Sequence, residues 1–254
     1  MFEAATARPA GESTVARLAL TAADYGYDGL VVLNPGNRLA EYDRGAVAGE
    51  YGIDVVDGVE IVAEDPAQAS GFLGNHRPKR TIVAVRGGTD SMNRFAVEHP
   101  AVDVLTRPFG IAGDDVTRGN DDTDTERSRP DAGGSVTVDH VLAKSAVENG
   151  VRIAFSFAPL LRDAGGSRVR AIQSLRKLRE LVAQYDAPYV ITADGASHLG
   201  LRAPQDLLAL GDVVDFTPDE VRAGLEEWRT LTERNRARQS EQFVEPGVWR
   251  SEDE

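Results

Sequence analysis

The sequence of 254 residues contains no cysteine, and this excludes disulfide bonds, thiolate zinc sites and thiol catalysis. It also lacks any run of about 18 consecutive apolar residues, so we predict no transmembrane helix. The first ten residues have neither the basic segment nor the apolar core of a secretory signal. We therefore expect a cytoplasmic protein that does not enter the membrane.

Lysine is nearly missing as well. Of the 28 basic residues only Lys79, Lys144 and Lys177 are lysines, and the net charge is −13. An acidic chain that keeps arginine and discards lysine is typical of a cytoplasm held at molar salt. At such salt the counterion release that drives nonspecific binding to nucleic acids is largely lost. The acidity therefore does not exclude RNA as a partner, because arginine can still bind phosphate through directed hydrogen bonds.

The charge is unevenly distributed along the chain. Residues 112–134 carry seven acidic residues and three arginines with no apolar periodicity, so we expect a disordered acidic insertion there. Residues 239–254 are predicted to form a disordered acidic tail. The span 144–179 is the opposite, with eight basic residues against Glu148 and Asp163. Such a basic span is either an ordinary solvated helix face or a surface that binds an anionic partner.

Common catalytic and nucleotide-binding motifs are absent. There is no phosphate loop, no dinucleotide-binding glycine motif and no nucleophile elbow. The four histidines lie far apart in the sequence, and only His198 falls in a loop after a predicted strand, where barrel sites lie. A metal site assembled from distant strand ends, with aspartates such as Asp103 and Asp194, stays open as an alternative.

Short apolar runs alternate with helical patterns along the chain, which is typical of a parallel sheet. About eight such units in this length favour a closed barrel over an open sheet. We predict an α/β fold, a TIM-like (β/α) barrel with mostly parallel strands, as a single domain over residues 1–238. The strands are expected at residues 2–6, 29–33, 53–63, 81–85, 102–105, 151–157, 189–192 and 213–214.

Several helix ends are marked by capping residues. Gly150 is expected to close a helix over 138–149, and residues 217–220 form a capping box with proline at the first helical position. Asp90 is predicted to cap a helix that runs through Val97. A short helix is predicted to begin at Pro204 and to end at Gly211.

Two segments resemble a known family. Residues 189–207 read as a strand, a turn of small residues and then the pattern L-R-x-P-x-D-L at Leu201–Leu207. Residues 2–17 and 25–32 resemble the start of the same family. This is the barrel-fold protein of archaeal and eukaryotic ribonuclease P, the relatives of the thirty-kilodalton human subunit. The resemblance covers the chain except residues 112–134 and the tail after about residue 238.

The resemblance implies a barrel similar to the polymerase-and-histidinol-phosphatase class of metal-dependent phosphoesterases. Those enzymes carry an H-x-H pair on the first strand, whereas residues 4–8 read Ala-Ala-Thr-Ala-Arg here. Without imidazoles there, a metal centre that activates water is not expected. We therefore expect no catalytic or metal-binding residues and no cofactor in this chain, with Mg²⁺ held by the catalytic RNA subunit. The implied partners are ribonuclease P RNA, precursor tRNA, a smaller α/β protein subunit and the other ribonuclease P proteins.

Arginine and lysine side chains after strands or on one helix face are the candidates for RNA contact. We predict RNA binding by Arg86, Arg107, Lys144, Arg170, Arg176, Lys177 and Arg202. Each could instead form a surface ion pair, and Arg202 could pair with Asp206. Arg168 and Arg179 lean toward the apolar face of the long helix predicted over 167–185, so we interpret them as structural.

The resemblance implies a structural subunit that binds RNA and positions the catalytic RNA and the precursor tRNA for removal of the 5′ leader. Two rival functions stay open from the sequence. The first is an active metal-dependent phosphoesterase of the related class. The second is a scaffold whose barrel binds only the smaller protein subunit, which would itself make the RNA contacts.

Overall fold

The computed structural model describes residues 1–109 and 138–240, together with the short strands at 243–245 and 248–249. In these residues a parallel sheet of seven strands runs in chain order. The strands are β1 Phe2–Ala5, β2 Gly29–Pro35, β3 Asp54–Ile61, β4 Ile82–Arg86, β5 Val104–Thr106, β6 Arg152–Ser156 and β7 Tyr189–Thr192. The single-domain barrel predicted from the sequence is confirmed, with seven strands instead of eight.

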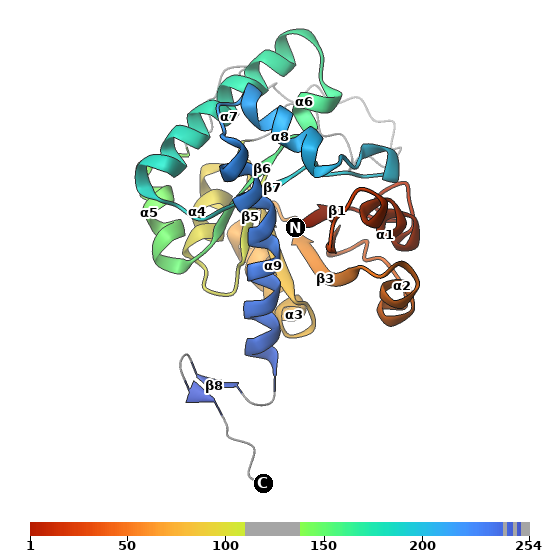
Figure 1. The fold of residues 1–254 in the computed structure, drawn as a ribbon. Coiled ribbons are helices and arrows are strands. Elements are labelled where there is room, and N and C mark those ends of the chain that lie inside the picture. Colours follow the sequence, from red (N-terminus) through yellow and green to blue (C-terminus); the bar gives the residue numbers. More distant parts are fainter. Residues whose placement is uncertain (110–137, 241–242, 246–247, 250–254) are drawn as a thin grey trace, which may run out of the picture.

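Helices connect the strands and cover the outside of the sheet (Figure 1). They are α1 Val15–Asp24, α2 Arg44–Tyr51, α3 Pro66–His76, α4 Asp90–Glu98, α5 His140–Asn149, α6 Ala158–Arg162, α7 Gly165–Tyr185, α8 Pro204–Val213 and α9 Pro218–Gln239. Two single-turn 3₁₀ helices, η1 Arg77–Lys79 and η2 His198–Gly200, complete the order. None of the helices described is both long enough and apolar enough to cross a membrane.

The helix ends follow the capping chemistry in the sequence, with two corrections. The predicted box at the start of α9 is present, with Thr217 and Glu220 capping each other, and Gly150 ends α5 in the left-handed conformation. Thr89, not Asp90, caps α4, because its hydroxyl accepts the main-chain N–H of Met92. Helix α8 continues past Gly211 to Val213.

The strand predicted at residues 213–214 is therefore wrong. Val213 is the last residue of α8, and Val214 is buried and donates its N–H to the carbonyl of Gly211. A pair of valines suits a strand and a buried helix end equally well, and two residues are too few for periodicity to separate them. The barrel consequently has no eighth strand between β7 and β1 in the described chain.

Helix α9 occupies the place where an eighth strand would close the barrel. β1 and β7 meet only at their carboxyl ends, where the N–H of Thr6 donates to the carbonyl of Gly195 at 2.9 Å. Farther down, the indole N–H of Trp228 donates to the carbonyl of Ile191 at 2.9 Å. The helix thus supplies a hydrogen bond that a neighbouring strand would otherwise provide.

The barrel interior is filled by alternate residues of every strand together with two residues of α9. Strand residues alternate between the two faces of a sheet, so every second side chain points inward. The inward cluster contains Phe2, Ala4, Val31, Val56, Ile82, Ala84, Val104, Ala154, Val190, Trp228 and Leu231. The small side chains at positions such as Ala4, Ala84 and Ala154 leave room for the indole of Trp228, which is fully buried.

Polar contacts tie α9, which lies in front of the sheet in Figure 1, to the amino ends of five consecutive strands. The partners lie at the starts of β2 to β6 and form the pairs Arg229–Asp28, Arg236–Asp54, Asn235–Thr81, Arg234–Asp103 and Glu227–Arg152. Because each strand is held separately, α9 closes this end of the barrel.

The acidic insertion predicted at 112–134 lies outside the described residues. In the segment predicted as a tail, β8 Phe243–Glu245 and β9 Val248–Trp249 form an antiparallel pair that the sequence did not predict.

The close packing of α9 on β7 gives a first test. A Cβ at Gly224 would lie 2.8 Å from Cγ1 of Ile191 and 2.9 Å from Cε2 of Tyr189, both held in the core. We predict that Gly224→Ala lowers the free energy of unfolding by about 1–3 kcal/mol, because the helix must move away from the sheet.

The matched control is Gly49→Ala on α2, where a Cβ meets nothing within 4 Å. That change should raise stability by about 0.5–1 kcal/mol through helix propensity alone. Urea denaturation of both variants in molar KCl measures the two effects. Equal effects would show that α9 does not pack tightly on β7.

Candidate functional site

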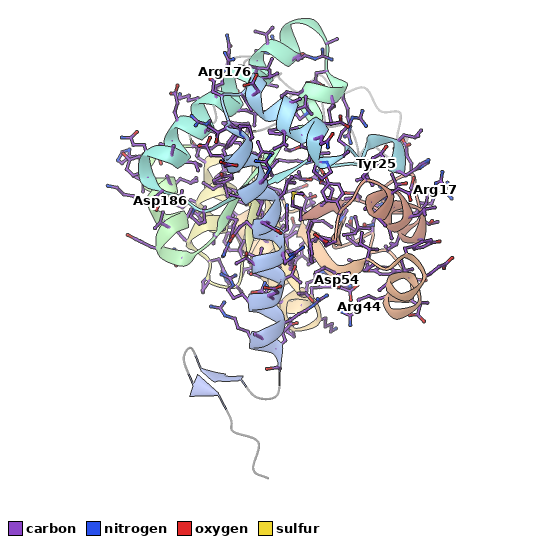
Figure 2. All side chains as sticks on the ribbon, in the orientation of Figure 1. Arg17, Tyr25, Arg44, Asp54, Arg176 and Asp186 are labelled. Carbon is purple, nitrogen blue, oxygen red and sulfur yellow. The ribbon has the colours of Figure 1, made fainter. Side chains whose placement is uncertain are left out.

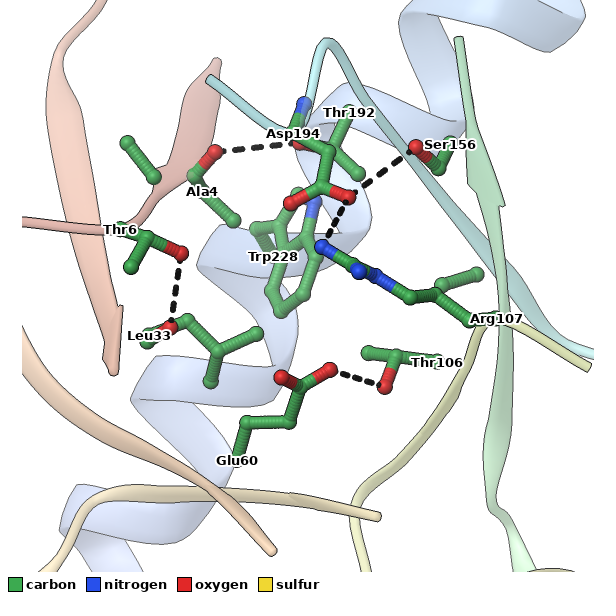
Figure 3. A pocket seen from close by; sticks show the side chains of 12 residues that line it. Ala4, Thr6, Leu33, Glu60, Thr106, Arg107, Ser156, Thr192, Asp194 and Trp228 are labelled. Atoms are coloured by element: carbon green, nitrogen blue, oxygen red, sulfur yellow. Dashed lines mark hydrogen bonds and ion pairs between the residues drawn. The ribbon is translucent and has the colours of Figure 1, made fainter. Parts of the chain in front are cut away.

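A hollow opens at the carboxyl ends of the strands (Figure 3). It is lined by Ala4, Ala5, Thr6, Leu33, Glu60, Thr106, Arg107, Ala154, Ser156, Thr192, Asp194 and Trp228. In α/β barrels the loops after the strands meet at this end, and this is where barrel enzymes place their active sites. Trp228 reaches it from α9, so the helix that closes the amino end also shapes the hollow.

The charged groups of the hollow are ion-paired. Arg107 places Nη2 3.0 Å from Oδ2 of Asp194, and Arg86 places Nη2 2.5 Å from Oε2 of Glu60. The hydroxyl of Thr106 donates to the other oxygen of Glu60 at 2.7 Å. Both carboxylates are therefore neutralised by a guanidinium group that the protein itself supplies.

The main chain is strained at one of these pairs. Arg107 has φ 47° and Asp194 has φ 51°, which is left-handed backbone. For a residue other than glycine such a conformation costs of order 1 kcal/mol and is concentrated at functional sites. The strain directs both side chains into the hollow, where they meet.

The hollow does not fit a catalytic metal centre. On β1 the lining residues are Ala4, Ala5 and Thr6, which offer no imidazole or carboxylate, and the two carboxylates of the hollow already face arginines. Nowhere in the described residues do three or more His, Asp or Glu side chains gather as metal ligands would.

The hypothetical metal site with Asp103 and Asp194 is wrong. Asp103 lies before β5 at the amino end, where it faces Arg77 and Arg234. Asp194 follows β7 at the opposite end of the barrel. The expected strands at 102–105 and 189–192 already put Asp103 near the start of one strand and Asp194 after the end of the other, and in a parallel barrel these two positions lie at opposite ends.

Glu3 completes the junction between β1 and β7 on the outer face of the barrel. Its Oε1 accepts the N–H of Ala193 at 3.1 Å, that of Ala4 at 3.0 Å and the hydroxyl of Thr192 at 2.5 Å. Its Oε2 lies 3.2 Å from the hydroxyl of Tyr27. A carboxyl group thus binds main-chain groups that a strand ladder would otherwise satisfy.

This carboxyl group is fully buried and has no cation beside it. Burial raises the pKa of Glu3 to about 7, and the hydrogen bonds from Thr192 and the main chain only partly oppose the rise. The hydroxyl of Tyr27 has one hydrogen, which it donates to the carbonyl of Arg202 at 2.8 Å. A protonated Oε2 can therefore donate to the oxygen of Tyr27, and this arrangement favours the neutral acid.

His198 is held by the loop that follows β1. Its Nδ1 lies 2.9 Å from Oγ of Ser13, and its main-chain N–H donates to the same oxygen at 3.0 Å. The histidine singled out from the sequence thus lies at the carboxyl end of the barrel, where it joins two loops.

The seven predicted RNA-binding residues fall into three groups. Arg86 and Arg107 lie at the hollow in the ion pairs described above. Lys144 on α5 and Arg170, Arg176 and Lys177 on α7 are exposed on the outer helix layer, where Arg176 can be seen in Figure 2. Arg202 follows η2 and is partly buried.

For three of these residues, the contacts show whether the side chain forms the ion pair that the sequence left open. Lys144 lies over the ring of Tyr185, and Arg176 contacts the carbonyl of Val213 and the carboxylate of Asp215. Arg202 does not pair with Asp206 as suggested, because its Nη1 donates to the carbonyls of Leu199 and Leu201.

The structural interpretation of two further arginines is supported by their contacts. Arg179 forms hydrogen bonds to both carboxylate oxygens of Glu220, and Arg168 donates to the carbonyl of Asp163. Sequence reasoning missed Glu3 and Glu60 as site residues. A charged residue inside an otherwise apolar strand, as at Glu3 and Glu60, was the available signal.

Fold and site together define a seven-stranded α/β barrel whose carboxyl-end hollow holds ion pairs between arginines and carboxylates. The family model for RNase P subunit p30 matches residues 1–113 and 130–240. The chain therefore belongs to the RNase P subunit p30 family and is a protein subunit of the ribonucleoprotein ribonuclease P.

The relatives agree with this assignment. Ribonuclease P protein component 3 of Haloarcula marismortui is 51% identical over 98% of this chain and 96% of its own length. The protein of the same name from Natronomonas pharaonis is 52% identical over 98% and 94%. A chain in a cryo-EM structure of archaeal ribonuclease P with mature tRNA has the same fold, with a TM-score of 0.75, 24% identity and full coverage of both chains. The halophilic origin of the relatives agrees with the molar-salt composition.

Glu3 supplies a prediction about pH. Its carboxyl group binds a proton more tightly in the folded chain than in the unfolded chain, where the pKa is 4.5. Its contribution to stability is therefore complete below pH 4.5 and is lost as the pH rises to about 7. The loss amounts to about 3 kcal/mol.

Glu3→Gln should remove this dependence, because the amide imitates the neutral acid. We expect the stability of Glu3→Gln relative to the wild type to rise between pH 5 and pH 7 and then to level off. Thermal denaturation at several pH values measures it, and Glu64→Gln at an exposed position is the control. A constant difference between Glu3→Gln and the wild type would contradict the raised pKa.

Proposed function

We propose that this chain positions RNA in ribonuclease P without performing the cleavage itself. The Mg²⁺-dependent removal of the 5′ leader from precursor tRNA belongs to the RNA subunit, and this chain binds no cofactor of its own. It acts in the cytoplasm with a smaller α/β protein subunit and the other ribonuclease P proteins.

The composition of the hollow is the observation that carries this proposal. A metal-dependent phosphoesterase needs several ligands that converge on one cation and an open position for water. Here the residues of the first strand are Ala4, Ala5 and Thr6, and the carboxylates of Glu60 and Asp194 face guanidinium groups. A divalent cation would have to displace both arginines.

The exposed basic residues support the RNA-binding part of the proposal. Lys144, Arg170, Arg176 and Lys177 lie on the outer surfaces of α5 and α7, while Leu175, Leu178 and Val182 on the other face of α7 pack into the core. We propose that these four residues and Arg202 contact phosphates directly. Arg86 and Arg107 act at the edge of the hollow, where their ion pairs hold the ends of β4 and β5.

A reconstitution experiment tests the proposal. Precursor-tRNA cleavage by the RNA subunit is measured in molar KCl and limiting Mg²⁺, with and without this chain and its smaller partner subunit. We expect cleavage to rise when both proteins are present. Failure of the pair to stimulate cleavage, or phosphoester hydrolysis by this chain alone with Mn²⁺, would support the metalloenzyme instead.

Variants then separate RNA contact from scaffolding. The double variant Arg170→Gln/Lys177→Gln should leave the melting temperature unchanged, because both residues are exposed, and should reduce stimulation about tenfold. Arg86→Gln should lower the melting temperature, because it leaves Glu60 buried without its ion pair. If RNA footprints and stimulation were the same for the double variant and the wild type, α7 would not bind RNA, and a barrel that binds only the partner subunit would be favoured.

A further inference from the structure

Two loops at the carboxyl end of the barrel are joined into one surface. These are residues 6–14, which follow β1, and residues 193–203, which follow β7. The main-chain N–H of Glu12 donates to the carbonyl of Ala196 at 2.7 Å, and Ser13 contacts His198. A Cβ at Gly11 would collide with the carbonyl oxygens of Thr6 and Ala196 at 2.1 and 2.6 Å, so only glycine fits where the two loops meet. We call these two loops, with Arg38 and Arg162, the β1–β7 platform.

Two arginines on the β1 side of the platform are held by main-chain carbonyls. Arg8 donates from Nε to the carbonyl of Glu12 at 2.7 Å, and Arg38 donates from Nη2 to the carbonyl of Pro9. Both side chains are exposed. Their guanidinium groups are thus oriented on the surface of the protein.

The β7 side repeats this arrangement. Arg162, at the end of α6, donates from Nη2 to the carbonyl of Asp194 at 2.7 Å. Arg202 donates from Nη1 to the carbonyls of Leu199 and Leu201 at 2.9 and 2.7 Å. A Cβ at Gly200 would lie 3.9 Å from Nη2 of Arg162, so both arginines lie at the same loop.

An arginine that donates to a main-chain carbonyl differs in one respect from an arginine that pairs with a carboxylate. The hydrogen bond to the carbonyl fixes the orientation of the guanidinium group but leaves its full positive charge and most of its five N–H donors available. None of the four arginines pairs with a carboxylate in the part of the chain that the structure describes, whereas Arg94 and Arg222 pair with Glu98 and Asp219 on the helices.

The platform is therefore a basic surface on an acidic protein. Its two loops contain two acidic residues, Glu12 and Asp194, and Asp194 is neutralised by Arg107. The net charge of the whole chain is −13. A concentration of oriented, positively charged groups at this end of the barrel calls for an anionic ligand with several acceptor oxygens.

We propose that the β1–β7 platform binds the sugar–phosphate backbone of RNA through Arg8, Arg38, Arg162 and Arg202. This inference rests on the proposed function and adds a surface that its α7 residues do not include. In molar salt the Debye length is about 3 Å, so attraction over a distance contributes little. Oriented guanidinium groups can still form paired hydrogen bonds to phosphate oxygens, because such contacts need little further ordering of the side chain.

The absence of cysteine makes a direct test possible. Leu199, at the platform, is 75% exposed, and Leu199→Cys would be the only thiol of the chain. Iron–EDTA attached there cleaves any RNA backbone close by in the reconstituted ribonucleoprotein. Thr230→Cys, exposed on α9 at the opposite end of the barrel, is the matched control. Labelling the ribonuclease P RNA in one experiment and the precursor tRNA in another shows which RNA supplies the phosphates.

We expect cleavage from position 199 in one of the two RNAs and weaker or different cleavage from position 230. Arg8→Gln, Arg38→Gln, Arg162→Gln and Arg202→Gln should each raise the concentration of this chain needed for half-maximal stimulation about tenfold. Arg94→Gln and Arg222→Gln, which are exposed and ion-paired elsewhere, should stay within about twofold.

The outcomes separate the platform from the proposed function. If the wild-type chain does not stimulate cleavage at all, the proposed function fails. If it stimulates cleavage, but position 199 cleaves neither RNA and the platform variants behave like the two controls, only the platform is wrong. Should a glutamine variant fail to fold, the result from Leu199→Cys still decides, because that chain keeps all four arginines.

Discussion

The closure of the barrel by α9 is the constraint on which the rest of this structure depends. Seven parallel strands leave main-chain groups of β1 and β7 without a complete ladder between them, and unpaired backbone groups in a core are costly. The indole N–H of Trp228 on α9 donates to the carbonyl of Ile191 on β7. The carboxyl group of Glu3 on β1 accepts the N–H of Ala193, the residue that follows β7. Polar contacts from α9 to the starts of five strands complete the closure. One helix therefore closes the gap in the sheet, closes the amino end of the barrel and places Trp228 beneath the hollow at the carboxyl end.

The closure of the barrel by α9 depends partly on ion pairs that are buried at the amino end. Arg234 and Arg77 face Asp103, which is 3% exposed, and burial lowers the pKa of Arg234 to about 10. A buried ion pair adds little net stability, but a wrong partner would leave a charge unpaired in the core, and that is strongly destabilising. The pairs thus fix which part of α9 meets which strand. Molar salt screens exposed charges far more than buried ones, so these contacts keep their effect at molar salt.

The sequence predicted the parts of the fold that depend on local patterns. The apolar runs marked the seven strands of the barrel, and the capping residues marked the end of α5 and the start of α9. The error at residues 213–214 came from a pattern too short to carry a period, and the role of α9 could not be read from the sequence. An amphipathic helix that covers a sheet and one that replaces a strand have the same periodicity, and only the contacts of Trp228 and Gly224 distinguish them. The sequence predicted that Arg86 and Arg107 follow strands and belong to the candidate site, but it did not predict their ion-pair partners. Ion pairing depends on contacts between residues far apart in sequence, such as Arg107 with Asp194.

The arginines of this chain show how one residue type can serve two purposes in an acidic protein. Where a carboxylate lies within reach, as for Arg86 and Arg179, the guanidinium group stabilises the fold and its charge is cancelled locally. Where the side chain donates to a carbonyl, as for Arg8 and Arg162, the guanidinium group is oriented and its charge is not cancelled by that contact. Lysine would fill the second role less well, because its ammonium group is a point charge on a flexible stem and lacks the planar fork that fixes the directions of its hydrogen bonds. Under the proposed function, a composition rich in arginine and poor in lysine suits RNA binding at molar salt, since arginine binds phosphate through directed hydrogen bonds and not through long-range attraction.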